Sequence, residues 1–284
     1  MVENRPYLKY LTHLILISGV VCVFFPIWIA FVASTHAPNE LLSSPVPWLP
    51  GSWDNFVANY SEILLQGFSG SSSVSVLKMM TNSMIMALSI AVGKISISIL
   101  AAYAIVYFQF PFRMTVFWIV FMTLMLPVEV RIVPTYAVIA NLGLLNSYAG
   151  LSIPLIASAT ATFLFRQFFL TIPRELVEAA KMDRAGPLRF FKDILLPLSR
   201  TNLAALFVIL FTYGWNQYLW PLLVTSDQSY STIVVSIQKM MTAADAEPQW
   251  HLIMATSVLA MIPPVIVVIL MQKAFVKGLV ETEK

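Results

Sequence analysis

Cysteine, histidine and charged residues are scarce in this sequence, and each shortage excludes a class of protein. The single cysteine, Cys22, cannot form a disulfide within the chain, so a disulfide scaffold is excluded. None of the three histidines has the H-E-x-x-H spacing of a zinc protease, and we expect no metal site. Charged residues make up 11% of the chain, against about 25% in soluble domains, and the net charge is only +3. These values exclude a disordered chain and a nucleic-acid-binding domain.

Apolar residues, by contrast, are abundant. They make up 58% of the 284 residues, and the mean hydropathy is +0.80. A chain of this length has too little interior to bury so much apolar surface from water, so we expect its solvent to be largely lipid. Arg5 and Lys9 precede the first apolar run, as in a secretory signal. Its 20 uncharged residues exceed the roughly 7–15 of a signal core, which favours an uncleaved membrane anchor.

The apolar runs predict an all-α membrane protein with six transmembrane helices. A bilayer core is about 30 Å thick, so a spanning helix needs about 20 apolar residues. The polar, turn-prone stretch from Asn141 to Gly150 divides the longest run in two. The expected spans are residues 12–34, 79–108, 113–139, 149–169, 201–225 and 251–273, all in one transmembrane domain, 1–284.

The distribution of basic residues predicts that both termini are cytoplasmic. With this topology, 13 of the 17 Lys and Arg residues fall in cytoplasmic segments. Lys78 and Lys239 fall outside, and Lys94 and Arg131 fall within spans. Because basic residues favour the cytoplasmic side of a membrane protein, the opposite topology is disfavoured.

The cytoplasmic segment between the fourth and fifth spans is longer than a simple turn. Pro173 suits the first turn of a helix, and Pro187 ends one. Between them, apolar side chains at helical spacing share one face and charged side chains lie opposite. We therefore expect a short amphipathic helix over about 174–186. Two roles are open: a helix that lies on lipid headgroups, or one whose small residues Ala179 and Ala180 let a partner protein approach closely.

A motif in this segment carries the strongest family signal. Its residues are Glu178-Ala179-Ala180, Asp183 and Ala185, followed by Phe191, Ile194 and Leu196-Pro197. The pattern resembles the EAA loop of ABC-importer permeases, which forms a coupling helix that docks in a cleft of the cytoplasmic ATPase. The resemblance assigns this coupling role to Glu178, Ala179, Ala180, Asp183 and Gly186. One position departs from the family pattern, because Arg184 stands where the family usually has glycine.

Similarity to one branch of this family extends over nearly the whole chain. Asn82-Ser83, the run from Trp215 to Pro221 and the ending from Phe275 to Leu279 resemble the carbohydrate-importer branch. Within that branch, the runs 3–6, 126–131 and 157–169 are most similar to permeases of sn-glycerol-3-phosphate importers. The resemblance implies a type I ABC-importer permease fold in the bacterial inner membrane, working by alternating access. It also implies three partners: a second permease subunit in a heterodimer, a dimeric cytoplasmic ABC ATPase and an extracytoplasmic substrate-binding protein.

The chain has no recognisable nucleotide site or catalytic triad. In the Walker pattern G-x-x-x-x-G-K-[ST], Gly93-Lys94 lacks the first glycine, and Ile95 replaces the hydroxyl residue. No Ser-His-Asp or G-x-S-x-G arrangement is visible either. We therefore expect no catalytic residue and no cofactor, and we expect a partner chain to hydrolyse ATP.

Six residues within the spans are candidates for the substrate path: Lys94, Glu129, Arg131, Trp215, Asn216 and Gln217. A lone charge at the bilayer centre costs roughly 2.5–3.5 kcal/mol, so each charged residue should face protein or water. Two interpretations of the charged residues are open: a structural pair of Glu129 with a cation, or a polar lining that favours an anionic substrate. Three interpretations are open for the residues from span five. They form an interfacial aromatic belt, they hydrogen-bond to another helix, or they bind polyol hydroxyls of the substrate.

The expected function is that of a permease subunit in an ATP-driven importer for sn-glycerol-3-phosphate. A permease for a neutral sugar or polyol of the same branch is the first alternative. A secondary transporter is the next, driven by a proton or sodium gradient through Glu129 or Lys94, and a membrane scaffold without transport is the last. Vanadate sensitivity of uptake separates the ATP-driven importer from the gradient-driven one.

Overall fold

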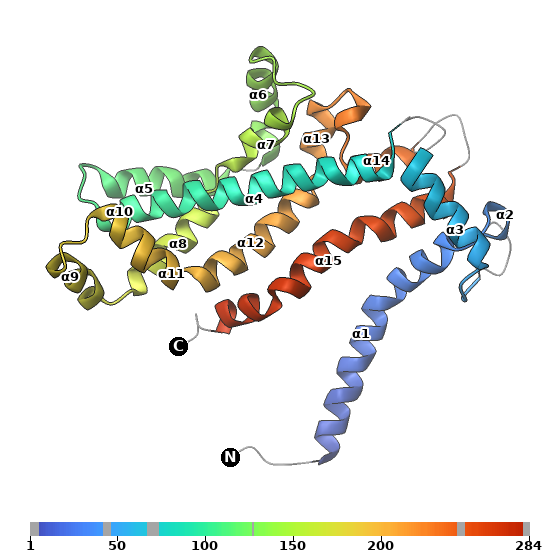
Figure 1. Ribbon diagram of the computed structural model, residues 1–284, viewed down its shortest axis with the longest axis horizontal. Coiled ribbons are helices and arrows are strands. Elements are labelled where there is room, and N and C mark those ends of the chain that lie inside the picture. Colours follow the sequence, from blue (N-terminus) through green and yellow to red (C-terminus); the bar gives the residue numbers. More distant parts are fainter. Residues whose placement is uncertain (1–5, 42–46, 67–73, 127, 243–247, 281–284) are drawn as a thin grey trace. The chain divides into compact units, whose positions relative to one another are not determined.

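The computed structural model describes residues 6–41, 47–66, 74–126, 128–242 and 248–280, and every regular element in these ranges is helical (Figure 1). The elements are α1 (Pro6–Ser34), α2 (Pro38–Leu41), α3 (Trp53–Ser61), η1 (Glu62–Gln66), α4 (Val76–Tyr107), α5 (Arg113–Met122), η2 (Thr123–Met125), α6 (Val128–Asn141), α7 (Tyr148–Ile156), α8 (Ala159–Thr171), α9 (Arg174–Met182), α10 (Pro187–Phe190), η3 (Phe191–Leu195), α11 (Leu196–Leu198), α12 (Arg200–Trp215), α13 (Leu219–Val224), η4 (Gln228–Tyr230), α14 (Ile233–Met241) and α15 (Trp250–Val280).

Three described helices are long and apolar enough to cross a membrane. They are α1 over Lys9–Ser34, α4, and α15 over Trp250–Gln272, and they coincide with the predicted spans 12–34, 79–108 and 251–273. Two bent pairs raise the number to five if each pair is one span. These pairs are α7 with α8, bent by 46°, and the segment Pro187–Leu198 with α12, bent by 72°.

The remaining predicted span, 113–139, is interrupted, because α5 and η2 are separated from α6. Leu126, which precedes Pro127, has an extended backbone with φ −84° and ψ 114°. The proline ring disfavours a helical conformation in the residue before it, so the break falls here. Pro127 itself lies outside the described residues. As a result, Arg131 lies near the start of a separate helix, α6, instead of within one continuous span.

The predicted spans 149–169 and 201–225 are also divided. Between α7 and α8 the side chain of Ser158 accepts a hydrogen bond from the backbone N–H of Ala161 and caps the second helix. In the other span, α12 ends at Trp215 and α13 follows after a short turn. Each long apolar run therefore yields two helices, because turn and cap residues inside it interrupt the backbone ladder.

The chain divides into two compact units, Met1–Lys78 with Ser236–Ile262, and Met79–Val235 with Pro263–Lys284. In the first unit, α3 is hydrogen-bonded to the end of α1. The buried amide of Asn59 donates to the carbonyls of Ser34 (2.9 Å) and His36 (3.0 Å). The hydroxyls of Tyr60 and Ser34 also share a hydrogen bond of 3.0 Å. The Asn59 bonds satisfy the carbonyls of the last residue of α1 and of a residue just beyond it, where the helix offers no partner.

In the second unit, two glycines lie at close contacts between α4 and its neighbouring helices. A Cβ at Gly214 of α12 would lie 2.9 Å from Cα of Ala87 on α4. A Cβ at Gly93 of α4 would lie 2.8 Å from the side chain of Ile156 on α7. In a membrane, lipid is as apolar as a protein core, so such close packing of small residues is a main source of helix association.

A cluster of buried apolar side chains joins α4, α6, α7 and α13 within this unit. Its members are Met86, Ile90, Ile139, Leu151, Trp220 and Val224. The indole N–H of Trp220 donates to the carbonyl of Gly150 (3.1 Å), which ties α13 to α7. The cluster holds these four helices together and positions the cavity that adjoins it.

Asn82 and Ser83, near the start of α4, bind the segment that leads into α14. The amide of Asn82 donates to the carbonyls of Ser229 (2.8 Å) and Ser231 (2.9 Å), and its oxygen accepts from the hydroxyl of Tyr148 (2.8 Å). The Ser83 hydroxyl accepts from the first backbone N–H of α14 (2.9 Å). This pair therefore has a structural role, because it satisfies backbone groups of a loop.

Candidate functional site

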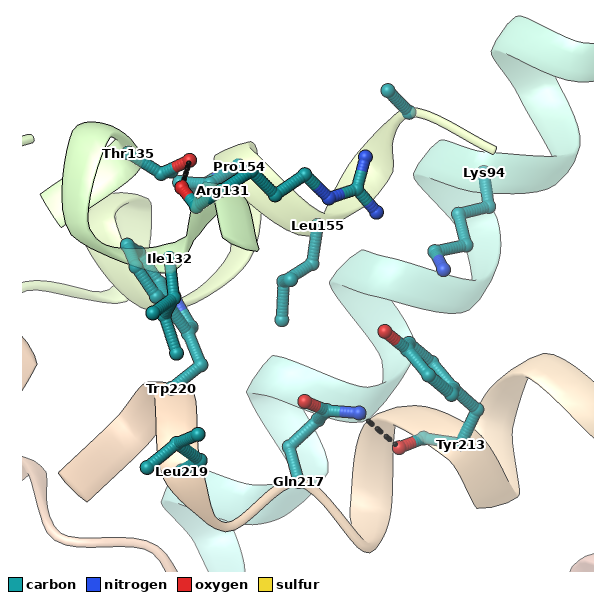
Figure 2. A pocket seen from close by; sticks show the side chains of 11 residues that line it. Lys94, Arg131, Ile132, Thr135, Pro154, Leu155, Tyr213, Gln217, Leu219 and Trp220 are labelled. Carbon is teal, nitrogen blue, oxygen red and sulfur yellow. Dashed lines mark hydrogen bonds between the residues drawn. The ribbon is translucent and has the colours of Figure 1, made fainter. Parts of the chain in front are cut away.

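A cavity of about 340 Å³ lies in the second unit, where α4, α6, α7, α12 and α13 meet (Figure 2). Its lining residues are Lys94, Arg131, Ile132, Thr135, Pro154, Leu155, Ala157, Tyr213, Gln217, Leu219 and Trp220. The volume is within the range of about 300–1,000 Å³ found for small-molecule sites. None of the described lining residues is acidic, so the described wall carries positive charge only.

Lys94 lies near the middle of α4. By helical rise it is about 27 Å from Val76 and about 20 Å from Tyr107. Its side chain is buried, with 8% of the residue exposed, and Nζ lies 3.9 Å from the centre of the Tyr213 ring. The negative face of an aromatic ring attracts an ammonium group, most strongly where water is excluded. Tyr213 thus stabilises the charge of Lys94 at a depth where a cation is costly.

Arg131 approaches the same cavity from α6. Its guanidinium extends across the cavity toward the α4 wall that carries Lys94 (Figure 2). Arg131 is exposed, unlike Lys94. The hydroxyl of Thr135, one turn later, donates to the Arg131 carbonyl (2.7 Å), so this hydroxyl is already engaged within α6. The structure therefore brings together two of the three charged residues predicted for the path.

The predicted pairing of Glu129 with a cation stays a prediction, because the side chain of Glu129 lies outside the described residues.

Of the three candidates from the fifth predicted span, the structure brings only Gln217 to the cavity. Its Nε2 donates to the carbonyl of Tyr213 (3.1 Å), and its amide lies along the cavity wall (Figure 2). Trp215 is 2% exposed and stacks on Phe211, and Asn216 is exposed at the end of α12. Sequence reasoning did not assign Tyr213 to the path, although its spacing of four residues from Gln217 is a signal of proximity.

The second candidate site is the segment for which a coupling helix over 174–186 is predicted. The helix α9 covers Arg174–Met182. Glu175 lies in its first turn and Lys181 in its last, where each charge interacts favourably with the helix dipole. Ala180 is buried beside a cavity of about 250 Å³ that it lines with, among others, Tyr103 and Tyr107 of α4. Residues 178, 179, 183 and 186 are exposed. One face of α9 therefore packs on this unit, and the other is open to a partner.

The backbone conformation of Arg184 shows how this residue replaces the glycine of the family pattern. Arg184 has φ 53°, the left-handed conformation for which glycine is usually selected. Its N–H donates to the carbonyl of Lys181 (3.0 Å), and the N–H of Ala185 donates to that of Ala180 (2.9 Å). These are the two bonds of a Schellman motif. Arg184 thus forms the turn that glycine would form, at a conformational cost, and α9 ends at Met182 instead of at Gly186.

Comparison with known proteins places the chain in a family. Residues 94–281 match the family model described as "Binding-protein-dependent transport system inner membrane component". Relatives from Agrobacterium fabrum and Brucella melitensis are 59% and 58% identical, and both chains are covered completely. A relative from Yersinia pestis is 56% identical, again with complete coverage of both chains. All three are named "sn-glycerol-3-phosphate transport system permease protein UgpE".

The fold has a solved counterpart. A bacterial ABC transporter involved in the import of the acidic polysaccharide alginate has a chain that superposes with a TM-score of 0.81 at 20% identity. The match covers 97% of this chain and 99% of that one. The type I permease fold predicted from the sequence is therefore confirmed. The family model matches about two thirds of the chain, and the relatives match its full length, so the chain belongs to the multi-pass inner-membrane components of binding-protein-dependent transport systems.

Proposed function

We propose that this chain is a permease subunit of an ATP-driven importer and that its substrate is sn-glycerol-3-phosphate. The observation that carries the proposal is the set of relatives, 56–59% identical over the full length, that are named for this transport activity. The cavity supports it, because Lys94 and Arg131 form a cationic wall and a phosphate monoester is an anion. A neutral sugar gives these two cations no electrostatic role.

The proposed assembly has four kinds of component. A second permease subunit encloses the path together with this chain, a substrate-binding protein delivers the substrate from outside, and a dimeric ATPase docks on the cytoplasmic side. The exposed face of α9 supports the docking step. Besides Glu178, α9 exposes two apolar side chains, Leu176 (40%) and Met182 (79%), and Leu188 (82%) is exposed in α10, which follows. Such side chains are typical of a surface that a partner covers.

The proposed cycle is alternating access across six spans, with both termini in the cytoplasm. Three uninterrupted helices and two bent pairs account for five of these spans. The interrupted segment α5, η2 and α6 supplies the sixth. ATP closes the ATPase dimer, and α9 transmits that movement because its inner face, at Ala180, is anchored beside α4. Hydrolysis of ATP by the partner resets the spans.

The direct test is uptake of radiolabelled sn-glycerol-3-phosphate by a strain that lacks its own uptake systems for this compound. The strain expresses this chain with its binding protein, partner permease and ATPase. We expect vanadate to inhibit this uptake. We expect an excess of unlabelled neutral sugar not to reduce it. Uptake that resists vanadate but collapses with the proton gradient would establish the secondary-transporter alternative instead.

The coupling role is tested by Glu178→Lys. The side chain is exposed on α9, so the substitution leaves the packing of the chain intact but reverses a charge at the proposed docking face. We expect loss of uptake with a normal amount of assembled complex. The matched control is Asp193→Lys, an exposed carboxylate in the same segment that pairs with exposed Arg189 at 3.5 Å. Normal uptake by Glu178→Lys would contradict the coupling role.

A further inference from the structure

Two cations from distant parts of the sequence line one cavity in the second unit. Lys94 is contributed by α4 near its middle, and Arg131 by the beginning of α6. Each is costly at membrane depth when it has no partner. Like charges in one cavity also repel each other. Packing alone gives no reason for this juxtaposition, since apolar residues of similar volume fill such a space without either cost.

We propose that Lys94 and Arg131 form a phosphate subsite in the translocation path of this chain, with the Tyr213 ring as the alternative partner of the Lys94 ammonium. The inference rests on the proposed function and extends it by assigning recognition of the phosphate group to this subunit. The ligand class is a small phosphate monoester that carries a polar, hydroxylated remainder.

The two cations are complementary to such a ligand. A phosphate monoester carries a charge of about −1.5 to −2 at neutral pH, so it neutralises both side chains at once. The planar guanidinium of Arg131 suits two parallel hydrogen bonds to phosphate oxygens, and the Lys94 ammonium acts as a point charge with three donors. In the cavity the Arg131 guanidinium points toward the wall that carries Lys94, which leaves the phosphate a position between them (Figure 2).

The contact between Lys94 and Tyr213 gives the subsite a moderate affinity. With Nζ 3.9 Å from the ring centre, the ammonium has an attractive partner when no phosphate is present. A phosphate group must compete with this contact, which weakens its binding. The contact also lets the lysine return to the ring when the substrate leaves. A transport path requires binding that is strong enough to select the substrate and weak enough to release it.

The remaining walls suit the rest of the molecule. Gln217 presents its amide along the cavity, with Nε2 engaged by the Tyr213 carbonyl and its oxygen able to accept from a ligand hydroxyl. Trp220 and Leu219 supply apolar surface, and the indole N–H of Trp220 is occupied by Gly150. The phosphate is therefore recognised by charge and the glycerol part by few polar contacts.

The experiment uses the complete transporter in proteoliposomes, and it measures uptake of sn-glycerol-3-phosphate and ATP hydrolysis side by side. In Lys94→Gln and Arg131→Gln, each of which removes one charged hydrogen-bond donor, we expect uptake to fall by roughly tenfold or more. Hydrolysis stimulated by the loaded binding protein should stay within about twofold of wild type, because α9 is untouched. The number of molecules imported per ATP therefore falls.

Three further variants separate recognition from structure. Lys94→Arg and Arg131→Lys keep the charge, and Arg131→Lys loses only the paired geometry of the guanidinium, so uptake should fall less in these variants than in the two charge-removing variants. Lys239→Gln removes a cation of α14 that does not line the cavity, and it should leave both activities unchanged. Wild-type uptake in the two charge-removing variants would overturn the phosphate subsite. An equal loss in the charge-keeping and charge-removing variants would also overturn it, because shape and not charge would then be what matters. If the wild-type complex imports no sn-glycerol-3-phosphate at all, the proposed function fails instead.

Discussion

Replacing Gly214 with alanine tests the close contact between α12 and α4. A Cβ at this position lies 2.9 Å from Cα of Ala87 and 3.4 Å from its carbonyl oxygen. Both atoms belong to the backbone, so no side-chain rotation relieves the overlap. We expect α12 to move away from α4 and to carry Tyr213, the preceding residue, away from Lys94.

Two opposing effects decide the size of the change. Alanine is favoured over glycine inside a helix by about 0.8–1.0 kcal/mol. Against this, an extra carbon in a well-packed interior typically costs about 1–3 kcal/mol. Carbon atoms settle at about 3.5–4.0 Å, so the helices must separate by roughly 0.6–1.1 Å, and dispersion is lost along the interface. The packing cost should win, with a net destabilisation of up to about 2 kcal/mol.

The measurement is thermal unfolding of the purified complex, followed by uptake. For Gly214→Ala we expect the Tm to fall by a few degrees and the substrate concentration for half-maximal uptake to rise, since Tyr213 and Gln217 shift together. The matched control is Gly19→Ala on α1, where no atom lies within 4 Å of the new Cβ. Its Tm should be unchanged or slightly higher, because only the helix preference acts.

The result that would refute this reasoning is a Tm for Gly214→Ala equal to or above that of wild type. It would mean that the two helices do not touch at this point. The contact that places Tyr213 over Lys94 would then need another cause.

Four other expectations can be tested, one from the distribution of basic residues and three from the structure. Arg184→Gly should raise the stability by about 1 kcal/mol in thermal unfolding and retain uptake, because the left-handed conformation costs a side chain roughly 1–2 kcal/mol; a loss of stability would contradict the turn. A reporter inserted within 181–193 should read cytoplasmic and one within 55–75 external, and the reverse result would invert the topology. Asn82→Ala should lower the stability by about 1–3 kcal/mol, seen as a lower Tm, because buried groups lose their partner; an unchanged Tm would show that water replaces the amide. Burial raises the pKa of the Tyr60 phenol above its usual value of about 10. The neutral phenol therefore stabilises the fold fully below pH 10, and this contribution is lost as the pH rises through the raised pKa. Tyr60→Phe should remove this part of the alkaline unfolding profile, and a profile identical to that of wild type would count against the burial.

The sequence alone predicted the membrane setting, the family and the helical class, because these depend on long stretches of the chain. Runs of about 20 apolar residues identify spanning segments whatever their neighbours are. Spans 12–34, 79–108 and 251–273 match uninterrupted helices for this reason. The interrupted spans were harder to predict, because a single residue such as Leu126 before Pro127 ends a helix without lowering the hydropathy around it.

The coupling segment contains one feature that the sequence predicts, the motif, and one that it does not, the backbone conformation at the end of the helix. The residues from Glu178 to Asp183 are recognisable as a pattern, and the amphipathic helix was predicted from the spacing. The end of that helix depended on whether Arg184 adopts a positive φ, and a sequence predicts that conformation at glycine, and less often at asparagine, but not at arginine. The structure placed Arg184 there with both Schellman hydrogen bonds.

What the tertiary structure alone decided is the composition of the cavity. Lys94, Arg131 and Gln217 are far apart in the chain, and they meet because α12 crosses α4 at Gly214 and because α6 is a separate helix. Trp215 and Gln217 are only two residues apart, yet one is buried against Phe211 and the other lines the cavity. Hydropathy and motif spacing report which residues are polar at depth. Only helix packing and the positions of the helix breaks determine which of those residues face one another.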